Sequence, residues 1–188
     1  MCHRPLVGTA IALLATLSFA GGAPIQGAKI DYYPLEKFSN APMWVFTELK
    51  ARGCRIPQAG HFNPKPHNLI RGEFVKKGQV DWAVLCSKNN KSSIVLLSLS
   101  KQQCTQELAV ADDSTFVQQV DSNQYRFSRM ITTATKSNIA RYMEREGDQP
   151  QLMDSDFDHE GITDEFVGKG SLIFYCKDAK WVELPGGE

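Results

Sequence analysis

The cysteines constrain the fold of this chain more than any other feature. Cys2 lies in an N-terminal leader, and the remaining ones are Cys54, Cys86, Cys104 and Cys176. An even number in an oxidising compartment indicates two disulfide bonds, and sequence alone permits three pairings. These wide spacings do not suit a structural zinc site. In the preferred pairing the first bond joins a helix end to a core strand and the second follows by elimination: Cys54–Cys86 with Cys104–Cys176.

The N-terminal segment has the features of a secretory signal peptide. Arg4 supplies a short positive region, and an uncharged apolar stretch runs from Leu6 to Phe19. We predict a signal peptide over residues 1–20, with cleavage as late as residue 28, followed by a single α+β domain over 29–188. The apolar run is too short for a membrane anchor. We therefore expect a secreted or periplasmic protein with no membrane span after cleavage.

The charge balance gives no reason to expect a nucleic-acid partner or an anionic membrane surface. The chain contains 21 Lys+Arg and 21 Asp+Glu residues, whereas binding to phosphate backbones needs an excess of positive charge. Neither a G-x-S-x-G nucleophile motif nor a phosphate-binding P-loop occurs in the sequence. These observations favour a non-catalytic protein.

Hydrophobic periodicity predicts both helices and strands. Helices are expected over 34–54 and 132–147, with a shorter one over 112–120. Short β-branched runs separated by turn residues indicate strands, and the two runs around the Asn89–Asn90 turn are apolar on both faces. That hairpin should be central and covered on two sides. We therefore predict an α+β fold, a small and mainly antiparallel sheet built from hairpins with two to four helices packed against it.

The acidic stretch DFDHEGITDEF, residues 156–166, is the strongest candidate for a metal site. Alternating carboxylates around a glycine supply the oxygen ligands that Ca²⁺ prefers. The alternative is a solvated turn that caps a helix formed by ITDEFVG, beginning near Gly161. Both interpretations stay open from sequence. The candidate calcium ligands are Asp156, Asp158, Glu160 and Asp164.

The spacing of these acids resembles the calcium loop of FG-GAP/VCBS-type repeats. Residues 73–81, EFVKKGQVD, lie in the same register, with Phe at position 2, Gly at position 6 and Asp at position 9. The resemblance implies two degenerate units, the first without acids at Val75 and Lys77. Two units are too few for a propeller, so it implies a borrowed loop within an α+β domain. The phrases RGCRIPQ, DWAVLCS and DHEGITDEF also resemble a group of uncharacterised exported bacterial proteins, which implies no activity.

Histidines and tryptophans give weaker signals. His61 and His67 flank FNPKP in a proline-rich segment, and we expect both to be exposed loop residues, because no third zinc ligand stands at a recognisable spacing. The three tryptophans lie within apolar runs, and we expect them in the core rather than on a sugar-binding surface.

Three functions compete. The favoured one is an exported non-catalytic module, calcium-stabilised if the acidic loop binds metal, that binds a protein or glycan of the cell envelope or stabilises an envelope structure. The second is a small inhibitor of a secreted hydrolase, such as a lysozyme or protease, with HFNPKPHN, residues 61–68, as the inserted element. The third is a hydrolase that uses carboxylates near the acidic stretch.

Overall fold

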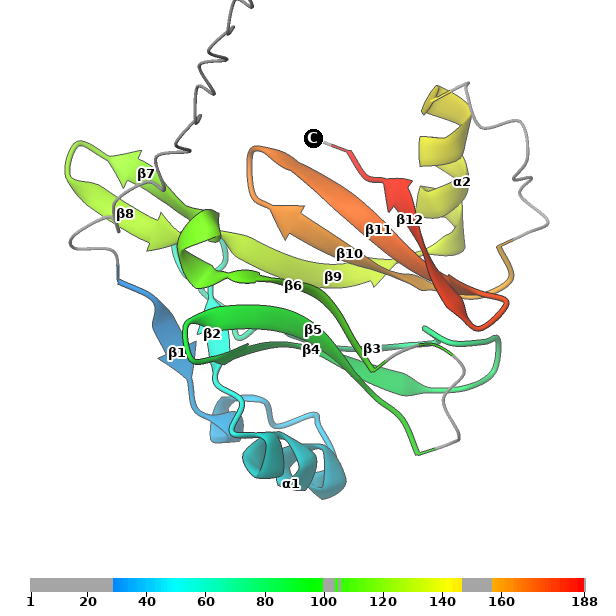
Figure 1. Ribbon diagram of the computed structural model, residues 1–188, viewed down its shortest axis with the longest axis horizontal. Helices are drawn as coiled ribbons and strands as arrows, with labels where there is room; N and C mark the ends of the chain where they lie inside the picture. Colours follow the sequence, from blue (N-terminus) through cyan, green and yellow to red (C-terminus); the bar gives the residue numbers. More distant parts are fainter. Residues whose placement is uncertain (1–28, 100–103, 105, 147–156, 188) are drawn as a thin grey trace, which may run out of the picture.

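The computed structural model describes residues 29–99, 104, 106–146 and 157–187, which are mostly antiparallel strands (Figure 1). One sheet contains, in spatial order, β3 (Leu69–Gly72), β4 (Asp81–Lys88), β5 (Lys91–Leu97) and β6 (Glu107–Asp112). The other contains β12 (Lys180–Pro185), β11 (Gly170–Lys177), β10 (Gly161–Phe166) and β9 (Arg129–Ala134).

Smaller elements surround these two sheets. Two ribbons pair β1 (Asp31–Tyr33) with β2 (Ile56–Gln58) and β7 (Val117–Asp121) with β8 (Gln124–Phe127). The α-helices are α1 (Met43–Arg52) and α2 (Lys136–Glu146), and the 3-10 turns are η1 (Leu35–Lys37) and η2 (Asp113–Phe116). In Figure 1, α1 and α2 lie on the outer sides of different sheets.

The alternation of side chains along the central strands builds three apolar layers. Ala83 and Leu85 of β4 pack with Phe174 of β11 in the core between the two sheets. The intervening β4 side chains Trp82 and Val84 pack against α1. On the far side, neighbours of Phe174 in β11 pack with Ile139 of α2. Because both faces of β4 are covered, its continuous apolar run is explained, and the predicted central hairpin is confirmed.

Two disulfide bonds fasten these layers together, so the prediction of disulfides is confirmed. Their pairs are those preferred from sequence, Cys54–Cys86 and Cys104–Cys176. The first ties the end of α1 to β4, and the second ties the segment before β6 to β11 in the other sheet. With sequence separations of 32 and 72 residues, loop-closure entropy gives each bond a stabilisation of about 4 kcal/mol.

Local turn chemistry agrees with the sequence at two element ends. Gly53 adopts φ 70° and caps α1 by donating its N–H to the carbonyls of Leu49 and Lys50. Asn89 and Asn90 have φ values of 53° and 62° and form the tight turn between β4 and β5. These are positions where a residue that tolerates the left-handed conformation is required.

The predicted α+β class is wrong, because the described chain is mostly β, with two facing sheets instead of one sheet covered by helices. The segment ITDEFVG is not a helix: β10 pairs with β9 on one side and β11 on the other. Residues 112–120 form only the turn η2 before continuing as β7. These segments are strands because β10 pairs with β9 and β11 and because β7 pairs with β8, and this pairing overrides local propensity.

The signal peptide at 1–20, with its later cleavage option at 28, lies outside the described residues and stays a prediction. None of the helices in the described part of the chain is long and apolar enough to cross a membrane.

Candidate functional site

The three described candidate ligands, Asp158, Glu160 and Asp164, each bind different protein groups. Asp158 contacts His159 and Tyr175, with Oδ1 2.7 Å from Nδ1 of His159 and 3.3 Å from the Tyr175 hydroxyl. Glu160 accepts the backbone N–H of Glu73 at 2.8 Å. Both oxygens of Asp164 bind Arg129. The fourth candidate ligand, Asp156, lies outside the described residues.

Arg129 makes the Asp164 pair a structural element of the core. Its side chain is fully buried, and Nε and Nη2 donate to the Asp164 carboxylate at 2.8 and 2.7 Å. Nη1 donates to the carbonyl and hydroxyl of Ser92, and Nη2 also reaches the carbonyl of Ala109. All five guanidinium donors therefore have partners. The pair joins β9 and β10 to the opposite sheet.

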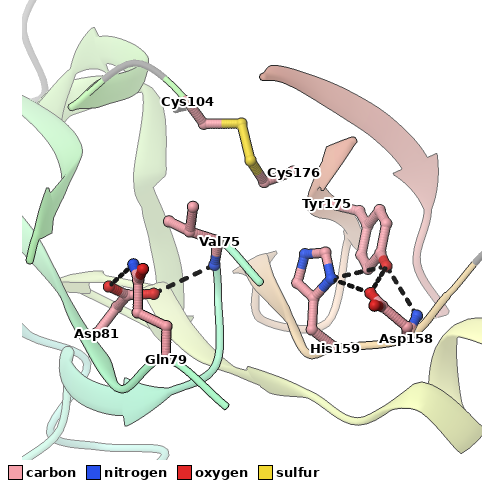
Figure 2. The surroundings of a disulfide bond; sticks show 8 residues. All are labelled: Val75, Gln79, Asp81, Cys104, Asp158, His159, Tyr175 and Cys176. Atoms are coloured by element: carbon pink, nitrogen blue, oxygen red, sulfur yellow. Dashed lines mark hydrogen bonds and ion pairs between the residues drawn. A yellow bond between two sulfur atoms is a disulfide. The ribbon is translucent and has the colours of Figure 1, made fainter. Parts of the chain in front are cut away.

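His159 is also a packing residue and not an exposed loop histidine. Its ring stacks on Tyr175 with centroids 4.2 Å apart, and the residue is only 4% exposed. The hydrogen bond from Nδ1 holds the pKa of the Asp158 carboxyl below its ordinary value, while burial raises the pKa of Tyr175. Figure 2 shows the ring near the Cys104–Cys176 disulfide.

The two stretches that share a register lie side by side but fold differently. Glu160 donates its N–H to the Glu73 carbonyl at 3.0 Å and accepts the Glu73 N–H in return. In the first stretch, Asp81 closes its own turn by accepting the N–H of Val75 and the side-chain amide of Gln79 (Figure 2). In the second stretch the sixth residue, Gly161, begins β10. The ninth residue, Asp164, therefore lies within this strand and binds Arg129 instead of closing a turn.

Gly161 has a packing role in this arrangement. As the first residue of β10 it approaches β11 so closely that a Cβ would meet Ile173 Cγ2 and the Phe174 carbonyl oxygen at 3.0 Å each.

Among the described residues, no group of three His, Cys, Asp or Glu side chains is placed to hold a metal ion. Calcium binding by this stretch stays a prediction.

The proline-rich loop, defined here as residues 59–68, connects β2 to β3 and presents an exposed tip. His61, Phe62, Pro64, Lys65 and Pro66 are exposed, although the residues at each end are buried. Gln58 closes the loop from inside: its side-chain oxygen accepts the N–H of His67 at 3.0 Å, and its amide donates to the His67 carbonyl at 2.9 Å. A side chain thus reproduces the two hydrogen bonds of a β-bridge.

His67 adds a second clamp, and the expectation that it would be exposed is wrong because it is only 8% exposed. Nε2 accepts the Ala59 N–H at 2.8 Å, and Nδ1 lies 2.8 Å from the Lys65 carbonyl. Since Nε2 must accept and Nδ1 must donate, the ring fits the loop in its neutral form. Burial lowers the pKa of His67, and the Lys65 carbonyl opposes this only in part.

Asn68 fixes the base of the loop to both sheets. It adopts φ 69°, a conformation that Asn tolerates better than most residues. Its side-chain oxygen accepts the N–H of Ile131, and its amide donates to the carbonyls of Pro57 and Arg129. The loop is therefore an exposed tip on a fully hydrogen-bonded base.

A cleft of about 320 Å³ lies between this loop and the η1–α1 connection. Trp82, Phe38 and Leu69 contribute apolar surface, and Lys37 and Lys65 contribute charge. No acidic side chain lines the cleft. Its volume is at the lower end of the range for small-ligand sites.

Sequence reasoning identified the loop but missed what rigidifies it. Gln58 and Asn68 are buried polar residues whose partners are backbone groups of other elements. A local sequence pattern does not predict such contacts. Lys37 reaches the cleft only because β1 pairs with β2 and brings η1 beside the loop. The two prolines of the loop, Pro64 and Pro66, were the one available signal.

A scan against protein-family models, a search of curated proteins and a search of solved structures each found no match. The function proposed next therefore depends on the contacts within this chain.

Proposed function

We propose that this chain is an exported, non-catalytic binding module that recognises a protein partner with the proline-rich loop. One observation carries the proposal: the loop tip is exposed while Gln58 and His67 hold its base through four hydrogen bonds. A loop that is already ordered loses little conformational entropy on binding, which is the main cost for a flexible recognition segment.

The exposed side chains of the tip are suited to protein recognition. Phe62 is 42% exposed although it is a large apolar residue, and aromatic residues are enriched among the anchors of protein interfaces. Pro64 and Pro66 flank Lys65 and restrict its backbone. The loop therefore offers one aromatic anchor and one cation on a stiff frame.

Inhibition of a secreted hydrolase is the specific activity that this design favours. Rigid exposed loops enter the concave active sites of hydrolases with little rearrangement of either partner. The acidic stretch supports a catalytic alternative less well, because the carboxylates of Asp158, Glu160 and Asp164 all bind protein groups.

Site-specific photo-crosslinking tests the binding role. A photoreactive phenylalanine is placed at Phe62 in one variant and at Leu172 in another, since these apolar residues are 42% and 44% exposed. Irradiation in the cells that produce the protein should yield a discrete crosslinked species from position 62 and none from position 172. Excess unmodified protein should suppress it. No product from position 62, or the same product from both, would contradict the proposal.

An inhibition assay tests the specific activity. The purified protein is titrated against lysozymes and secreted serine proteases, beside a variant in which residues 60–65 are replaced by Gly and Ser. Because Gln58 and His67 are retained, the variant should keep its melting temperature within a few degrees and lose inhibition. Inhibition that survives the replacement would exclude the loop as the inhibitory element, and failure against every enzyme would exclude the inhibitor role.

A further inference from the structure

The cleft beside the proline-rich loop carries positive charge that the protein does not neutralise. Lys37 and Lys65 line it from opposite elements, η1 and the loop, and neither forms an ion pair with a described residue. Two cations facing one space repel each other, and an anion placed between them relieves that repulsion.

Trp82 supplies a second and independent indication of a ligand. The residue is 92% buried, being 8% exposed, and it lines the cleft. Its indole N–H forms no hydrogen bond with a described residue, and it keeps some contact with solvent. Buried tryptophans usually find a partner for this donor. The unpaired donor and the apolar walls of Phe38 and Leu69 suit a ligand that combines an apolar group with hydrogen-bond acceptors.

We propose that this cleft binds an acidic peptide segment of the partner protein, with one apolar side chain against Trp82 and a carboxylate at Lys37 and Lys65. The inference rests on the proposed function, because it gives the chemistry of the segment that follows the loop contact. A protein partner is favoured over a free sugar because the cleft is continuous with the loop tip through Lys65 and Pro66. It also offers apolar walls and not an exposed aromatic platform.

Another cleft of the molecule does not have these properties. It has a volume of about 400 Å³ and lies beside the Cys54–Cys86 disulfide. Its Arg52 pairs with Glu48 and its Lys91 with Asp112, while its Glu107 accepts a hydrogen bond from Ser93. Most of its charge is therefore satisfied within the protein.

Nuclear magnetic resonance tests the cleft directly. The three tryptophans give three indole N–H signals, and the Trp82 signal is followed in the oxidised, ¹⁵N-labelled protein. The probes are the peptide acetyl-Glu-Phe-Glu-amide, its neutral analogue acetyl-Gln-Phe-Gln-amide, and glucuronate. The acidic peptide should shift the Trp82 signal saturably and bind about tenfold more tightly than the neutral one, since each lysine contributes a screened surface attraction.

A charge-matched pair of variants provides the control. Lys37→Gln with Lys65→Gln should weaken binding of the acidic peptide by about tenfold. Lys76→Gln with Lys77→Gln removes the same charge from exposed positions outside the cleft and should change the affinity less than about twofold. Equal binding of both peptides, equal loss in both double variants, or a shift with glucuronate alone would overturn the inference.

The two proposals fail separately. If position 62 gives the discrete crosslink, or the loop replacement abolishes inhibition, but the acidic peptide does not bind, the cleft inference falls and the loop function stands. If the peptide binds at the cleft but position 62 gives no crosslink and the loop replacement leaves inhibition unchanged, the loop function falls and with it the assignment of the peptide to that partner.

Discussion

The acidic stretch and the proline-rich loop differ in how far their charged side chains are bound within the protein, and the difference is the reverse of what their sequences suggest. The stretch is dense in carboxylates, but Asp158, Glu160 and Asp164 each bind a protein group. The loop holds a single cation at its tip, but that cation, Lys65, has no ion-pair partner among the described residues. In the acidic stretch the charges hold the fold together, whereas in the loop the fold holds a charge in place.

This difference shows that the density of charged residues is a poor guide to a binding site. The Asp164 carboxylate, with both oxygens bound by the buried Arg129, has little left to offer a ligand, because an incoming cation must compete with that guanidinium. Lys65 has no ion-pair partner and the Trp82 N–H has no hydrogen-bond partner among the described residues. Both can therefore contact a ligand without breaking an existing interaction. A binding site is therefore better sought among charged and hydrogen-bonding side chains that have no partner within the protein.

The largest expected effect comes from breaking the buried pair of the acidic stretch. Asp164→Ala leaves the fully buried Arg129 without its counter-charge, which should lower the free energy of unfolding by about 3–5 kcal/mol. Glu165→Ala, at the next residue of β10 and without an ion pair in the described structure, is the control. Urea denaturation measures both. Equal, small losses would mean that Asp164 is free for another role.

A smaller loss is expected from removing the clamp of the loop. Gln58→Ala strands the backbone N–H and carbonyl of His67, which should cost about 2–3 kcal/mol. Hydrogen exchange of the amides in residues 60–66 should also accelerate. The exposed Gln124 provides a matched control, since Gln124→Ala should change stability by less than about 0.5 kcal/mol. Unchanged exchange in Gln58→Ala would show that the loop is rigid without its side-chain clamp.

Sequence predicted those parts of the fold that depend on local chemistry. The end of α1 at Gly53 and the turn at Asn89–Asn90 need particular backbone conformations, and the residues that tolerate them are visible in the sequence. Strand β10 could not be predicted in this way. Asp164 is poorly suited to a strand, and its place there depends on Arg129, 35 residues away.

The candidate site was predictable to a similar degree. The prolines indicated a stiff exposed segment, but the cleft beside it is assembled from η1, the loop and two strands. Its charge is visible only once Lys37 and Lys65 are known to face one space. Likewise, His67 and His61 look equivalent in sequence, and only the Ala59 N–H distinguishes the buried ring from the exposed one.

The stability of the proline-rich loop should depend modestly on pH because of His67. Burial lowers the pKa of His67 below its ordinary 6.5, so below pH 6.5 the unfolded chain takes up a proton that the folded ring does not. The stabilisation is complete above the unfolded pKa and is lost as pH falls from there through the folded pKa. Protonation also breaks the Ala59 bond, so loop amides should exchange faster in acid. His67→Gln should remove this fall in stability below pH 6.5. The same profile in variant and parent would contradict this account.

The smallest expected effect on stability is at the residues assigned to binding, and this sharpens the comparison most. Lys37 and Lys65 are exposed and form no ion pair with any described residue, so replacing both with Gln should change the free energy of unfolding by less than about 0.5 kcal/mol. The sign should be slightly stabilising, because the substitution removes repulsion between two cations that share a cleft. Chemical denaturation of this double variant beside Asp164→Ala therefore tests both regions in one measurement. A loss above about 1 kcal/mol would place the two lysines in the structural class to which Asp164 belongs. A neutral or stabilising outcome together with weaker peptide binding would mean that these charges are kept for a partner and not for the fold.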